Sequence, residues 1–226
     1  MLMTSFLTLL FATDNPVLPP PLAMQLALHG VWTVLLGGAV LCLAERLSPL
    51  YRWGAAGLVA LWTLLPGEIS PAFWLGLAFQ TPSVMSVLLC LGCLWRSYRQ
   101  APGVALNAVS RRAWSWLAGL GIVLGWVLLL DTLAWWPLSV YAWGFSAAAV
   151  GAVALAAVLL WGISGQAVWA LPLGVLVLFV LTRLPTGNVW DALLDPWLWV
   201  ALQAGWLVNL VRRWQAARHV SPTTRA

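Results

Sequence analysis

The chain has 226 residues, of which 62% are hydrophobic and 8% are charged, and its mean hydropathy is +0.92. About a quarter of the residues in a soluble globular domain are charged, so this composition excludes an ordinary soluble domain and favours a membrane protein. The net charge of +5 comes from eleven cations, all arginine, and these are scattered singly and in pairs, which argues against a nucleic-acid-binding surface.

Seven apolar stretches are long enough, or nearly so, to cross a bilayer, which takes about 20 predominantly apolar residues. We therefore expect an all-α fold, a polytopic membrane helix bundle of about seven transmembrane helices with short loops. The predicted spans are residues 22–44, 53–66, 72–95, 113–136, 138–161, 166–182 and 191–211. The predicted regions are a short outer N-terminal segment (1–21), a seven-helix transmembrane domain (22–211) and a basic cytoplasmic tail (212–226).

The arginines predict how these spans are oriented. With seven spans, ten arginines fall on one side of the membrane and only Arg183 falls on the other. Because cytoplasmic loops carry the excess of positive charge, we expect the N-terminus outside and the C-terminus in the cytoplasm. Arginine without lysine, with many alanines, leucines and tryptophans, suggests a GC-rich bacterial genome and hence the cytoplasmic (inner) membrane. The eighteen tryptophans fit an interfacial belt.

Most of the acidic residues fall on the predicted outer side, where they form a candidate polar site. A histidine beside carboxylates is able to act as a general base or a metal ligand. Asp191 and Asp195 face the same way if one helix runs through both, with Pro196 in its first turn. A hydrogen-bonded histidine and ordinary helix N-terminal acids fit the same pattern, so both interpretations are kept. The candidate outer site comprises His29, Glu68, Asp131, Arg183, Asp191 and Asp195.

The third predicted span contains a second candidate site. The run Gln80-Thr81-Pro82-Ser83 places a proline inside the span, where it leaves a backbone carbonyl without its usual partner. With the deep amide of Gln203 in the seventh span, this run forms a candidate solute pathway. A packed kink is the alternative interpretation of the same residues.

The sequence contains no complete catalytic constellation, so we expect no metal and no cofactor. The three cysteines, Cys42, Cys90 and Cys93, lie inside apolar segments and are odd in number, which argues against a disulfide framework. The small residues Gly121 and Gly125 predict close helix packing in the fourth span.

These features leave three functional hypotheses. The leading hypothesis is a non-catalytic accessory, assembly or scaffold subunit, with the lipid bilayer and other membrane subunits as partners and no nucleic acid. The alternatives are a small-solute transporter that uses the kinked third span, and an outer-face membrane enzyme that uses His29 and the outer carboxylates. The sequence leaves the substrate, the partner and the oligomeric state open.

Overall fold

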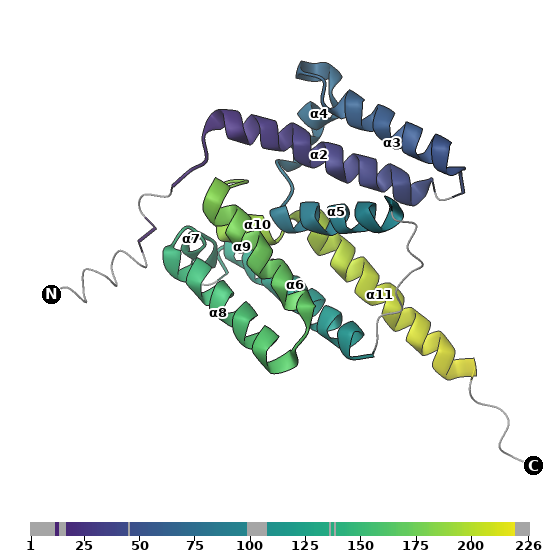
Figure 1. Ribbon diagram of the computed structural model, residues 1–226. Helices are drawn as coiled ribbons and strands as arrows, with labels where there is room; N and C mark the ends of the chain where they lie inside the picture. Colours follow the sequence, from purple (N-terminus) through teal and green to yellow (C-terminus); the bar gives the residue numbers. More distant parts are fainter. Residues whose placement is uncertain are drawn as a thin grey trace, which may run out of the picture.

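The computed structural model describes residues 12–13, 17–44, 46–98, 108–135, 137 and 139–219, and every regular element among them is helical. The predicted all-α class is therefore confirmed. Figure 1 shows α2 and α3 side by side at one edge of the bundle, and α11 leading away from it toward the C-terminus. The predictions for the N-terminal segment up to residue 11 and for the tail from residue 220 lie outside the described residues.

Ten α-helices and two short 3-10 helices make up this part of the chain. In chain order they are α2 (Pro21–Leu43), α3 (Pro49–Thr63), η1 (Gly67–Ile69), α4 (Pro71–Phe79), α5 (Val84–Tyr98), α6 (Ala108–Thr132), α7 (Val140–Trp143), α8 (Ala147–Ser164), η2 (Ala167–Trp169), α9 (Ala170–Thr182), α10 (Val189–Leu193) and α11 (Pro196–His219). Four of them begin with proline, whose fixed φ suits the first helical position and whose missing N–H needs no partner there. α8 ends at Gly165, which adopts the left-handed conformation (φ 62°).

Within the described ranges, three helices are long and apolar enough to cross a membrane. They are α2 with 23 residues, residues 111–132 of α6, and α8 with 18 residues. They correspond to the first, fourth and fifth predicted spans, and they fit a membrane protein. α3 and α5 have 15 residues each, about 22 Å of helix, which is less than the roughly 30 Å of a bilayer's hydrocarbon core. The count of seven spans therefore stays a prediction.

Two of the predicted spans are interrupted. The third is split into α4 and α5 at residues 80–83, as the proline in that run predicts, and Gln80 adopts a positive φ of 61° there. The seventh is split into α10 and α11 because Asp195 lies between them and its carboxylate caps the first turn of α11. The condition that one helix runs through Asp191 and Asp195 is therefore not met, since α10 ends at Leu193 and α11 begins only at Pro196.

The hydrophobic core lies where α5, α8, α9 and α10 meet. Val175 and Phe179 on α9 are fully buried there against Ala149 on α8 and Ala192 on α10. α2 packs against α3 and α5 and extends the bundle on the other side of α5. The core is thus built mainly from the shorter helices of the bundle.

α6 packs against α11 through the predicted small-residue face. A Cβ atom at Gly125 would lie 2.2 Å from the Trp199 ring, and one at Gly121 would lie 2.9 Å from the Leu202 side chain. The Trp199 indole donates a hydrogen bond to the carbonyl of Ile122, at 3.2 Å. The prediction of close packing is confirmed, since a larger residue at Gly125 would overlap the Trp199 ring and one at Gly121 would require the Leu202 side chain to shift.

Candidate functional site

Asp195 is the one buried residue of the candidate outer site, with 7% of its surface exposed. Its Oδ2 atom accepts three hydrogen bonds, from the Ser83 N–H (2.8 Å), the Ser83 hydroxyl (2.7 Å) and the Ser86 hydroxyl (2.5 Å). Its Oδ1 atom accepts the Leu198 N–H at 2.8 Å. We call Asp195, Ser83 and Ser86 the Asp195 cluster.

The helix break in the predicted third span builds this cluster. Ser83 precedes α5, and its hydroxyl also accepts the Ser86 N–H at 3.1 Å, as an N-cap does. α11 begins directly after Asp195, so the N-termini of two helices point at one carboxylate. Since a helix N-terminus carries partial positive charge, the arrangement favours a negative side chain between them. The cluster joins two distant parts of the chain through Oδ2, while Oδ1 caps the first turn of α11, which follows Asp195 directly.

Tyr141 connects two more of the predicted acids. Its N–H donates to the Asp131 carboxylate at 2.7 Å, and its hydroxyl donates to the Asp191 carboxylate at 2.8 Å. Asp191 also accepts the Thr186 hydroxyl. Tyr141 lies on α7, ahead of the α8 span, where burial and then the charge of Asp191 raise the pKa of its hydroxyl. A tyrosine hydroxyl is protonated at neutral pH, and these two effects favour that hydrogen-bond-donating form further.

Asn188 completes this group and was not found by sequence reasoning. The fully buried amide donates to the Tyr141 carbonyl at 2.9 Å, and its oxygen caps α10 by accepting the Trp190 N–H at 2.9 Å. A Cβ atom at Gly144 would lie 2.0 Å from that oxygen, so only glycine fits there. A possible signal was the asparagine directly before a short apolar run, which is typical of an N-cap.

The other predicted outer residues contact different parts of the chain. The Nδ1 atom of His29 lies 3.1 Å from the Gln25 carbonyl, while Nε2 is buried and has no hydrogen-bond partner among the described residues. Glu68 is exposed on η1, and the Arg183 guanidinium lies 5.4 Å from the centre of the Phe179 ring. In the described structure none of the three shares a hydrogen bond with Asp131, Asp191 or Asp195.

The residues of the candidate solute pathway are partly engaged in packing. The Gln80 carbonyl accepts the Trp32 indole N–H at 3.1 Å, Thr81 is half-buried and Pro82 is buried. Gln203 is half-buried on α11, and within the described ranges no hydrogen bond joins it to Gln80. The packed kink, the alternative interpretation of this run, fits these contacts.

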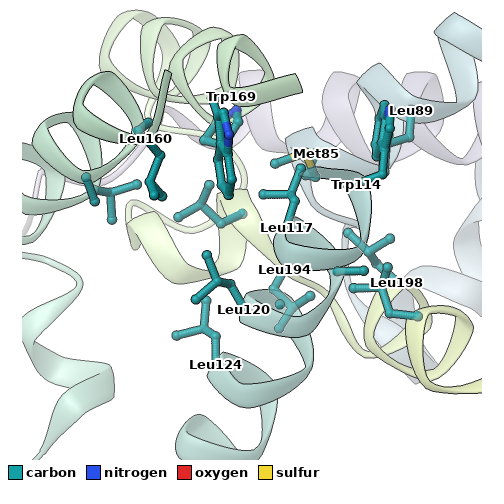
Figure 2. A pocket seen from close by; sticks show the side chains of 18 of the residues that line it. Met85, Leu89, Trp114, Leu117, Leu120, Leu124, Leu160, Trp169, Leu194 and Leu198 are labelled. Carbon is teal, nitrogen blue, oxygen red and sulfur yellow. The ribbon is translucent and has the colours of Figure 1, made fainter. Parts of the chain in front are cut away.

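An apolar cavity of about 300 Å³ lies between α6, α8 and η2, with further walls from α5, α9, α10 and α11. Figure 2 shows the Trp169 indole between Leu160 and Leu117, with Leu120 and Leu124 further along α6. Trp169 is 4% exposed. Sequence reasoning missed this cavity, because its walls come from seven separate elements.

The part of the chain that the structure describes has no group of three or more His, Cys, Asp or Glu side chains placed to hold a metal ion. Comparisons with protein families, curated proteins and solved structures found no match to this chain.

Proposed function

We propose that the chain is a non-catalytic subunit of the bacterial cytoplasmic membrane, an accessory or assembly protein that packs against other membrane helices. One observation carries the proposal. Each residue from 204 to 216, in the C-terminal half of α11, is exposed, and α11 leads away from the bundle toward the C-terminus (Figure 1). Lipid and the helices of another subunit are the surroundings that suit its apolar residues.

The predicted polar site supports a structural role. Asp195 joins the start of α11 to the start of α5, and Tyr141 links Asp131 to Asp191. These carboxylates accept hydrogen bonds that hold separate elements together, as the polar groups of a scaffold do. Such a scaffold presents a fixed outer surface to its partners.

Asn209 points to the part of α11 that meets a partner. This exposed amide interrupts the apolar residues Leu207, Val208 and Leu210, and no described residue forms a hydrogen bond with its side chain. A polar group facing lipid is unfavourable, whereas an amide that bonds across a helix pair contributes about 0.6–2 kcal/mol. The amide therefore suits a contact between α11 and a neighbouring helix.

Extraction in a mild detergent followed by native mass measurement tests the proposal. We expect the chain to be retained in an assembly, and we expect Asn209→Leu to weaken that assembly about threefold. Gln215→Leu makes the same amide-to-leucine change beyond the apolar run, and it should leave the assembly intact. A lone monomer for the wild-type chain refutes the proposal.

A discontinuous helix supports a second candidate function, small-solute transport. Transporters place unwound helix segments at their substrate sites, and the chain breaks between α4 and α5 at Gln80. Uptake or efflux in proteoliposomes that falls in both Gln80→Ala and Gln203→Ala would favour this function over the first. Unchanged flux in both variants eliminates it.

A further inference from the structure

We propose that the apolar cavity binds one acyl chain of a bilayer phospholipid, and that the Trp169 indole N–H donates a hydrogen bond to the ester carbonyl of that lipid. The inference concerns a site separate from the exposed half of α11. It is independent of whether the chain assembles with other subunits.

The first observation is a buried donor without an acceptor. The Nε1 atom of Trp169 is buried and has no hydrogen-bond partner within the described part of the chain. Burying an N–H group without a hydrogen bond is unfavourable, and buried indoles usually find an acceptor. Trp169 forms part of the cavity wall (Figure 2), and a small rotation of its side chain turns this N–H toward a ligand in the cavity, which then supplies the acceptor.

The second observation is the size and length of the cavity. An apolar cavity of about 150 Å³ binds benzene, so about 300 Å³ accommodates on the order of ten carbons. The wall on α6 runs from Trp114 to Leu124, which is about 15 Å at the rise of an α-helix. A long, narrow, apolar space fits a hydrocarbon chain better than a compact polar metabolite.

The third observation is where the cavity opens. Two of its wall residues are exposed, Leu120 on α6 and Ala156 on α8. Both helices are long and apolar enough to cross a membrane, so the opening between them faces lipid. A lipid chain is therefore able to enter sideways from the bilayer.

The fourth observation is the depth of the donor. Trp169 lies on η2, which follows the end of α8, and it packs near Ala113 and Trp114 at the start of α6. Arg111 and Arg112, one turn earlier on α6, line a cleft with Arg213 of α11. Indoles and arginines at one end of a bundle are typical of the membrane interface, where the ester groups of phospholipids also lie. An ester carbonyl at Trp169 thus leaves the acyl chain pointing along α6.

An ester lipid and its ether analogue test the hydrogen bond. Dioleoyl phosphatidylglycerol and the corresponding dialkyl-ether lipid are titrated into the delipidated full-length protein in detergent, and bound lipid is counted by native mass spectrometry. One neutral hydrogen bond is worth about fivefold in affinity, so the wild-type chain should prefer the ester lipid by about that factor. Trp169→Phe keeps the ring but removes the donor, and it should bind both lipids equally.

A second pair of variants tests the cavity itself. Ala156→Trp fills the opening of the cavity. If it keeps as few as two methylene groups of the acyl chain out of the cavity, lipid binding weakens about tenfold. Leu155→Trp makes a similar change at the neighbouring position, which is exposed on α8 but is not part of the cavity wall, and it should bind as the wild type does. Equal binding of ester and ether lipids by the wild-type chain overturns the assigned hydrogen bond. Undiminished binding by Ala156→Trp overturns the cavity as the site.

Discussion

Replacing Asp195 with asparagine tests the contact that organises the helix break. The carboxylate accepts four hydrogen bonds, three at Oδ2 and one at Oδ1. Asparagine offers only one acceptor oxygen, and its NH₂ group cannot accept a hydrogen bond from the backbone N–H group that faces it. At least one of the N–H groups of Ser83 and Leu198 therefore loses its partner.

The size of the destabilisation expected for Asp195→Asn follows from the hydrogen bonds that it loses. A buried donor left unpaired costs about 1–3 kcal/mol, and the loss of charge-assisted bonds to the two serine hydroxyls adds to this. We expect Asp195→Asn to lower the free energy of unfolding by about 2–4 kcal/mol. Glu68→Gln makes the same chemical change at an exposed acid, and it should stay within about 0.5 kcal/mol of the wild type.

Unfolding in mixed micelles with an increasing fraction of SDS, followed by circular dichroism, measures both variants. Ser86→Ala then completes a double-mutant cycle, and its effect should be smaller in the Asp195→Asn background because the two residues share a hydrogen bond. Equal stability of Asp195→Asn and Glu68→Gln would refute the reasoning. It would mean that the carboxylate does not hold the starts of α5 and α11 together.

Three further predictions concern packing, the outer polar group and topology. Gly125→Ala should destabilise the chain by about 1–3 kcal/mol, because the new methyl group meets the indole on α11, whereas Gly119→Ala, with open space around its Cβ, should be neutral or stabilising in the same SDS titration. Tyr141→Phe should lower the free energy of unfolding by about 1–3 kcal/mol and speed hydrogen exchange in α10, because the Asp191 carboxylate loses one of its hydrogen-bond donors. In a background without the native cysteines, Val17→Cys and Gln215→Cys should react with impermeant thiol reagents on opposite sides of the membrane. Labelling of both from one side contradicts the odd number of spans.

Several elements were predictable because their signals are local. The first predicted span, residues 22–44, corresponds closely to α2, since a continuous apolar run and a proline at its start define a helix without reference to other parts of the chain. The break at residues 80–83 followed from proline's missing N–H. The second break, before Pro196, was missed because an acid followed by proline fits the first turn of a continuing helix as well as the start of a new one.

The candidate site also has a part that the sequence predicted and a part that only the structure shows. The sequence singled out Asp131, Asp191 and Asp195 because most of the acidic residues fall on the predicted outer side, and all three accept hydrogen bonds from other segments. It could not predict which partner each takes, since Ser83 and Asp195 are 112 residues apart along the chain. Their meeting depends on how whole helices pack.

By itself, the sequence determined the helical class, the three described helices that are long and apolar enough to cross a membrane, and the face of α6 that packs closely. Hydropathy, proline and glycine act over one or two turns of helix, so no knowledge of distant residues is needed. Only the tertiary structure decided that the Asp195 carboxylate links the starts of α5 and α11, that Tyr141 links Asp131 to Asp191, and that seven elements enclose a cavity beside Trp169. These features arise where separate helices meet, and a contact between helices is set by the packing of the whole bundle.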